Sequence, residues 1–281
     1  MPTFSIFHCD ERFESVLYNL LHHSRTGLSK GLFALQLTRA CGYSPEATKC
    51  QYSPQNKLQY SKYKYYLSHL LIDVQSDAVS GWLMLASFFY AHKNYFASLP
   101  VIYYTLQKYT DEKILTGPFN DSIDLPLSRK SFNHIQRYVL NLMKKEKLFT
   151  ILKTLNMYPV LFNPNSSLTP QVLQIDFKER LIGYHPLSFA YFLCFLCNYR
   201  LHDITSCIHY LQQLCHFCSI KYAADNLLGI PVKYFLDANI FCGIAHQLMG
   251  NTHIARQRFQ QIAGYNKYNI STAATRLSRL N

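Results

Sequence analysis

The chain contains 281 residues, of which 49% are hydrophobic and 16% are charged. A chain of this length and composition can bury one or two ordinary cores, which excludes an intrinsically disordered protein. Its 10 glycines and 11 prolines exclude a collagenous or low-complexity chain, and its net charge of +12 is compatible with an anionic partner.

The N-terminal part predicts three helices. Apolar residues recur at helical spacing over residues 11–21 and 28–40. Two prolines predict a loop over residues 42–56, and a third helix should begin near Lys57. We therefore expect an N-terminal helical segment over residues 1–78, followed by a helical-hairpin region over residues 79–281.

A tetratricopeptide-like hairpin is expected at the start of that second region. Four residues follow the W-x2-L-G-x2-Y spacing of the first repeat helix: Trp82, Leu85, Ala86 and Phe89. The predicted hairpin covers residues 79–109, with its turn at Lys93 and Asn94. Pro100 should kink or delay the second helix because proline lacks a backbone N–H.

Small residues recur twelve positions apart and mark the contact between paired helices. Ser98 follows Ala86 by this step, and Ala255 follows Gly243 by the same step. Small side chains allow two helices to approach closely. The spacing therefore predicts a second, similar hairpin near the C-terminus.

An irregular connection separates the first hairpin from the rest. Residues 110–127 include Gly117, Pro118 and Pro126, which are typical of a loop. Helices are expected over residues 128–144 and 148–157, and an irregular segment over residues 158–171.

Two further hairpins and a terminal helix complete the prediction. The expected helices cover residues 187–201, 204–217, 232–249, 252–263 and 272–280. No segment shows clear period-two alternation. The predicted fold is all-α, with antiparallel helical hairpins stacked as a tetratricopeptide-like right-handed array.

Several phrases carry a family resemblance, at residues 28–33, 77–86, 185–189, 195–203 and 243–251. They resemble the C-terminal helical tail of invertebrate male-abnormal-type, cGAS-like nucleotidyltransferase-fold proteins. The catalytic half of that family carries a Gly-Ser turn and paired acidic residues, whereas this chain has no Gly-Ser dipeptide. Asp73 and Asp77 are expected to be solvated at a helix end. The resemblance implies a noncatalytic tail of an innate immune sensor, detached from its enzyme.

The nine cysteines favour a reducing, cytoplasmic setting, since no secretory signal follows Met1. The apolar run of residues 186–197 is too short to span a membrane and predicts a buried helix. Two Cys-x2-Cys pairs have the spacing of a zinc site: Cys194, Cys197, Cys215 and Cys218. Bulky apolar neighbours favour structural packing of these cysteines over metal binding.

No catalytic residue and no cofactor are predicted, because phosphate-binding glycine loops and an activated nucleophile are absent from the sequence. We expect a noncatalytic scaffold that binds a protein through the first helices of its hairpins. The residues expected on that concave face are Ser87, Tyr90, Tyr191, Asn198, Asn239 and His246.

The alternative function is an accessory module that binds nucleic acid or another anionic ligand. No acidic residue follows Asp237, and lysines alternate with tyrosines after residue 57. The expected anion-binding residues are Lys57, Lys62, Lys64, Arg256, Arg258, Arg276 and Arg279. A solvated, amphipathic helix face is the simpler interpretation of these charges.

Overall fold

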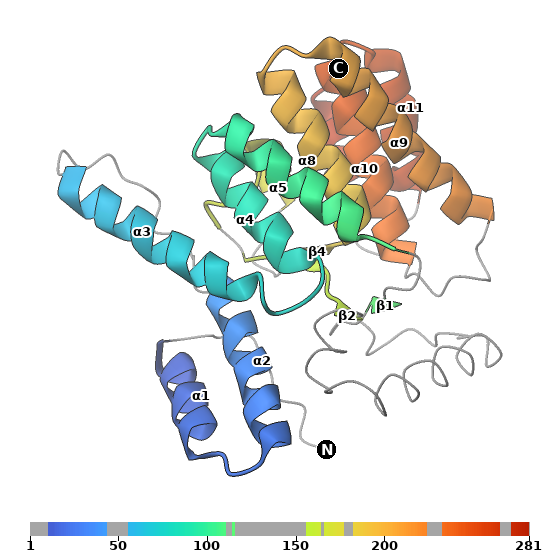
Figure 1. The fold of residues 1–281 in the computed structure, drawn as a ribbon. Coiled ribbons are helices and arrows are strands. Elements are labelled where there is room, and N and C mark those ends of the chain that lie inside the picture. The colour runs from blue at the N-terminus through green and yellow to red at the C-terminus, as the bar shows by residue number, and fades with distance from the viewer. Residues whose placement is uncertain are drawn as a thin grey trace.

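The computed structural model describes residues 11–43, 56–110, 114–115, 156–163, 166–176, 182–223, 232–264 and 271–280. Ten α-helices and four short strands lie in this described part, so the predicted all-α helical array is confirmed (Figure 1). The predictions for residues 44–55, 116–155 and 224–231 lie outside it. No helix of the described part is long and apolar enough to cross a membrane.

Three helices form the N-terminal segment, which extends away from the other helices (Figure 1). They are α1 (Glu11–His23), α2 (Gly27–Tyr43) and α3 (Asn56–Asp73). Each packs on the next along the chain, and α3 continues the series by packing on α4. The segment is thus joined to the hairpins by helix packing as well as by the chain.

Three antiparallel hairpins follow, each formed by two helices that are consecutive in the chain. Their helices are α4 (Ser80–Ala91) with α5 (Tyr95–Lys108), α8 (Pro186–Arg200) with α9 (Ile204–Ala223), and α10 (Val232–Leu248) with α11 (Thr252–Ala263). The helix α12 (Ser271–Ser278) packs on α11 at the end. Contrary to expectation, Pro100 does not delay α5, which begins five residues before it.

All three hairpins use the same turn. The second residue after each first helix has a positive φ: 60° at Lys93, 59° at His202 and 81° at Gly250. The next residue in each turn donates its backbone N–H to the carbonyl five positions earlier, at 2.9, 3.0 and 2.9 Å. This is the Schellman arrangement, which ends a helix by satisfying its last carbonyls. In the first two hairpins this same residue, Asn94 or Asp203, also caps the second helix with its side-chain oxygen.

The twelve-residue step places a small residue against the facing helix in each hairpin. Ser98 donates its hydroxyl to the Ala86 carbonyl at 2.9 Å, and the Cys207 thiol lies 3.8 Å from the Phe195 carbonyl. In the third hairpin, a Cβ added to Gly243 would overlap the ring of Phe259. The absence of larger side chains therefore sets how closely the paired helices approach.

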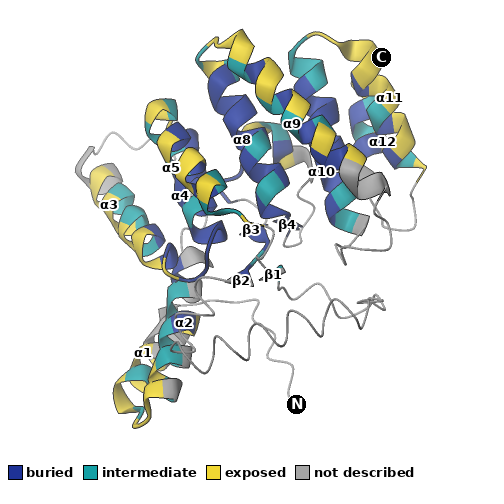
Figure 2. Cartoon of the chain, turned by 45° about the vertical axis from the view of Figure 1, so that its right-hand side comes forward, coloured by how far each residue is buried: buried dark blue, intermediate teal, exposed yellow. Residues whose placement is uncertain are grey.

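The core is centred on α8, which is buried along most of its length (Figure 2). It packs against α5, α9 and α10, so nearly every side of it is covered. Phe192 stacks on Phe241 of α10 with ring centroids 4.5 Å apart. This explains why the segment reads as uniformly apolar rather than amphipathic.

Two small sheets are formed by strands that lie between the first and second hairpins in the sequence. The strands β1 (Ile114–Leu115) and β2 (Asn156–Met157) are parallel, and β3 (Val160–Phe162) is antiparallel to β4 (Ile182–Tyr184). The expected helix over residues 148–157 is wrong at its end, where β2 lies. All residues of β3 and β4 are buried, so these strands lack the alternation that would have predicted them.

Asp73 and Asp77 are buried, with 6% and 2% of their surface exposed, so the expectation that they are solvated is wrong. Asp77 accepts hydrogen bonds from three backbone N–H groups at the start of α4, those of residues 79–81, at 2.8–3.2 Å. Its second oxygen accepts from the N–H of Tyr158 at 2.9 Å. Burial raises the pKa of Asp77, and these hydrogen bonds oppose that shift. One carboxyl group thus ties the first hairpin to the segment carrying β2 and β3.

Candidate functional site

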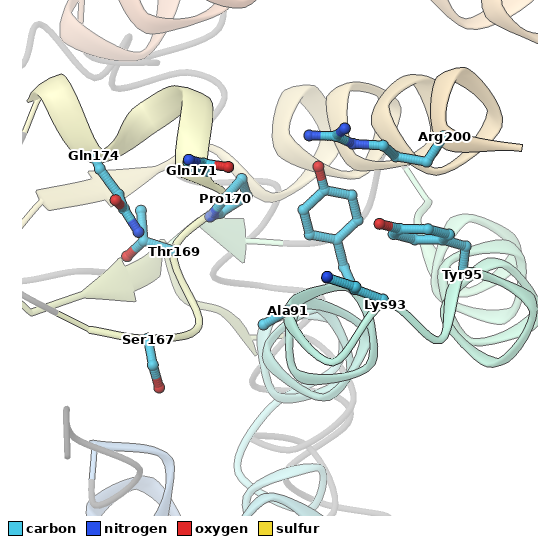
Figure 3. Close-up of a pocket in the computed structure, with 10 residues that line it drawn as sticks. Ala91, Lys93, Tyr95, Ser167, Thr169, Pro170, Gln171, Gln174 and Arg200 are labelled. Atoms are coloured by element: carbon cyan, nitrogen blue, oxygen red, sulfur yellow. The ribbon is translucent and has the colours of Figure 1, made fainter. Parts of the chain in front are cut away.

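A polar pocket of about 430 Å³ opens where α4, α5, α8 and residues 167–174 meet. Its volume is in the range of ligand-binding pockets. The lining residues are Tyr90, Ala91, Lys93, Tyr95, Ser167, Thr169, Pro170, Gln171, Gln174 and Arg200. Figure 3 shows the pocket between two walls, with the residues of segment 167–174 on one side and Lys93, Tyr95 and Arg200 on the other.

Helix ends hold the two cationic side chains of the pocket. Lys93 lies in the left-handed turn after α4, and Arg200 is the last residue of α8. Cations are favourable at these positions because the carbonyl end of a helix carries partial negative charge. The opposite wall is a tight turn in which Thr169 donates its N–H to the Ser166 carbonyl at 3.3 Å. The N–H of Leu173 then donates to the Pro170 carbonyl at 2.8 Å, at the start of the short 3₁₀ helix Gln171–Asp176.

The pocket carries positive charge that no carboxylate of the described residues neutralises. Within the described residues, no aspartate or glutamate lines it, and neither Lys93 nor Arg200 forms an ion pair. Arg200 instead donates a hydrogen bond to the Tyr90 hydroxyl. Burial raises the pKa of Tyr90, whereas that hydrogen bond raises the pKa of Arg200. Both groups therefore keep their protons at neutral pH, and the pocket stays cationic.

Thr169 adds a buried hydroxyl to this pocket. The residue is 4% exposed, and its Oγ1 has no hydrogen-bond partner among the described residues. An unpaired buried hydroxyl is unfavourable unless a ligand or water satisfies it. Together with the cations and tyrosine hydroxyls, it makes the pocket suited to an anionic group such as a carboxylate or phosphate.

Most residues predicted for a concave protein-binding face are in the interior. Ser87 is 0% exposed, and Asn198 and Asn239 donate their amides to carbonyls of their own helices at 2.9 Å. Tyr191 and His246 are half-buried. Of the six, Tyr90 alone lines the pocket. Stacking of the hairpins covers the polar first-helix positions that an isolated hairpin would expose.

The predicted basic residues do not form one surface. The Lys57 side chain lies outside the described residues, Lys62 is half-buried, and Lys64 lies 4.6 Å over the Tyr60 ring. Three arginines bond internally: Arg256 to the Leu280 carbonyl, Arg258 to the Asn239 side chain, and Arg276 to the Val172 carbonyl. Arg276 is 5% exposed, whereas Arg279 is exposed. Part of the C-terminal positive charge therefore holds the fold together.

The two Cys-x2-Cys pairs do not face each other as a tetrathiolate centre. Cys194 and Cys197 are fully buried in α8, where burial raises the pKa of Cys197 to about 12. Cys215 and Cys218 of α9 instead contact Cys242 of α10, which the sequence reasoning missed. Within the described residues, no group of three or more His, Cys, Asp and Glu side chains is placed to hold a metal ion.

Of the lining residues, only Tyr90 was predicted as a site residue, and the important ones that were missed are Lys93, Thr169 and Arg200. Lys93 lies in the predicted turn of the first hairpin and Arg200 lies near the end of the helix predicted over residues 187–201, and these positions were the available signal. Nothing local connects them to Thr169, which lies in a segment expected to be irregular. Comparison of the chain with family models, with curated proteins and with solved structures found no match.

Proposed function

We propose that the protein is a noncatalytic helical scaffold that binds a protein partner through an acidic segment. The observation that carries this proposal is the pocket in which Lys93 and Arg200 lie beside the Tyr90 hydroxyl with no carboxylate partner among the described residues. A carboxylate of the partner would supply the missing negative charge and accept hydrogen bonds from both cations.

An exposed apolar residue next in sequence to a lining residue favours a peptide over a small anion. Phe96 is 77% exposed and directly follows the pocket residue Tyr95. Exposed aromatic residues next to polar contacts are typical anchors of protein interfaces. The partner segment we envisage therefore carries an acidic residue close to an apolar one.

The test measures binding of a fluorescein-labelled peptide of glutamates and leucines by fluorescence anisotropy. The double variant Lys93→Ala/Arg200→Ala loses two charge-assisted hydrogen bonds and should bind at least about tenfold more weakly. The control Lys64→Ala/Arg279→Ala removes the same charge at exposed sites elsewhere. Equal weakening in both variants would indicate general charge attraction and would contradict the proposal.

A second candidate function is binding of RNA or another polyanion through α3. Lys64 and Tyr60 are both exposed there, with Lys62 on the same helix. Alternating cations and aromatic rings can contact phosphates and stack on bases. RNA retention that falls steeply with salt and is lost in Lys62→Ala/Lys64→Ala would support this candidate.

We also propose a relationship to the helical tail of the cGAS-like proteins and a location in the cytoplasm. The three hairpins with a shared turn support a repeat of tetratricopeptide type. Six cysteines of α8, α9 and α10 are free thiols, which suits a reducing compartment: Cys194, Cys197, Cys207, Cys215, Cys218 and Cys242. An in-frame Gly-Ser turn followed by paired acidic residues upstream of Met1 in the gene would support the relationship. An unrelated upstream domain would contradict it.

A further inference from the structure

Three cysteines and a histidine meet where α9 packs against α10. The sulfurs of Cys215 and Cys218 each lie 3.7 Å from the sulfur of Cys242. Nε2 of His246 lies 3.9 Å from the Cys215 sulfur. Cys218 and Cys242 are buried, whereas Cys215 is half-buried. Of the three thiols, Cys215 is therefore the one that a small solute can reach.

The surroundings of Cys215 stabilise its negatively charged form. The groups facing it are the Cys242 thiol, which donates a hydrogen bond, the His246 ring and the charge of Arg258. They lower the pKa of Cys215 to about 5, although burial opposes the shift. The same hydrogen bond holds the pKa of Cys242 well above its ordinary value. At neutral pH the pair therefore consists of a thiolate beside a protonated thiol.

Other cysteines of the helical core are in the opposite situation. Cys207 lies on α9, is buried, and burial raises its pKa to about 11. Burial likewise raises the pKa of Cys194 well above the usual range. Oxidation of cysteines follows thiolate character and access, so reactivity among these residues should concentrate at Cys215.

We propose that Cys215 is a site of reversible oxidation by hydrogen peroxide and that Cys242 captures the oxidised sulfur as a disulfide between α9 and α10. The sulfurs are already in contact, and side-chain rotation has to reduce their separation from 3.7 Å to about 2.05 Å. An accessible thiolate next to a resolving thiol is the arrangement found in redox-sensing cysteines.

The chemistry has two balanced steps. The Cys215 thiolate attacks one peroxide oxygen, the O–O bond breaks, an S–O bond forms and hydroxide leaves. This two-electron oxidation produces a sulfenic acid on Cys215. The Cys242 sulfur then attacks the Cys215 sulfur, forming the S–S bond and breaking the S–O bond. The departing hydroxide takes the Cys242 thiol proton and leaves as water. A thiol reductant reduces the disulfide back to the two thiols by thiol–disulfide exchange.

The test follows the disulfide by mass spectrometry in the full chain. The reduced protein is treated with peroxide at pH 7, its remaining thiols are blocked with N-ethylmaleimide, and it is digested with trypsin without reduction. Cleavage at lysine and arginine places Cys207, Cys215 and Cys218 in the peptide of residues 201–221, and Cys242 in that of residues 234–256. We expect these peptides linked through Cys215, with Cys207 still blocked by maleimide as an internal control.

Variants separate the roles of the three thiols, and far-UV circular dichroism establishes that each variant is folded. Cys242→Ala should lose the link and accumulate a Cys215 sulfenic acid that dimedone traps. Cys218→Ala and the control Cys207→Ala should keep the link. Linkage that persists in Cys215→Ala would overturn the assignment of the attacking sulfur. Cys215 that oxidises no faster than Cys207 in the wild-type chain would also overturn the proposal. So would purified protein whose Cys215 is bound to zinc and unreactive.

Discussion

Replacing Asp77 with alanine should destabilise the protein much more than the same replacement of Asp203. Each carboxylate accepts hydrogen bonds from the start of a hairpin helix, Asp77 from α4 and Asp203 from α9. The local chemistry is therefore alike. Asp203 is exposed and accepts from the backbone N–H and hydroxyl of Ser206, at 3.0 and 2.7 Å. Asp77 is 2% exposed and accepts from four backbone N–H groups, including that of Tyr158.

The magnitude follows from what each substitution leaves unpaired. Loss of an exposed N-cap costs about 0.5–2 kcal/mol, because water replaces the acceptor. Asp77→Ala leaves three buried donors and one part-buried donor without their acceptor, and each buried donor costs about 1–3 kcal/mol if unsatisfied. Since relaxation and entering water recover part of the loss, we expect a decrease of about 3–5 kcal/mol, comparable to breaking a buried charged network.

Urea unfolding gives the free energy of both variants, followed by far-UV circular dichroism and by Trp82 fluorescence. Trp82 is the single tryptophan and lies in α4, three residues after the first residue bonded to Asp77, Val79. It therefore reports on the hairpin that Asp77 anchors. Equal losses in Asp77→Ala and Asp203→Ala would refute the conclusion that tertiary hydrogen bonding makes Asp77 special.

Three further outcomes are expected. Gly81→Ala should lower stability by about 1–3 kcal/mol, because the new Cβ would overlap the Asp73 backbone carbonyl. In the control Gly27→Ala, the new Cβ meets nothing within 4 Å. Thermal unfolding should show the control to be neutral or slightly stabilising. Arg276→Ala should lower the melting temperature through loss of its bond to the Val172 carbonyl, and the exposed Arg279→Ala should leave it unchanged. Because the folded pKa of Cys215 is about 5, below the unfolded value of about 8.5, its thiolate contributes stability that is complete above the unfolded pKa and is lost as pH falls through 5. Cys215→Ala should therefore cost more stability at pH 8 than at pH 5 in reducing urea titrations, and an equal cost at both would contradict the shift.

Local signals predicted the helices well. The apolar periodicity of residues 232–249 and the Gly250-Asn251 turn act within a few residues, so one segment contains the information that defines its own hairpin. The bounds of α8 and α11 agree with expectation within one residue for the same reason. The strands β3 and β4 escaped prediction because full burial removed their alternating pattern.

The pocket and the cysteine cluster depend on which helix faces dock, and this is not written in any one segment. Lys93, Thr169 and Arg200 are far apart in the chain and meet only when the first two hairpins pack beside the 167–174 turn. In the same way, the i,i+3 pair of Cys215 and Cys218 turns toward Cys242 rather than toward the matching pair on α8. The sequence by itself determined where the hairpin helices begin and turn, because those features rest on local hydrogen bonding and periodicity, although α9 continues to Ala223 beyond the predicted end at residue 217. Tertiary packing alone decided which polar and sulfur groups became neighbours, because burial of the apolar faces sets how the hairpins stack.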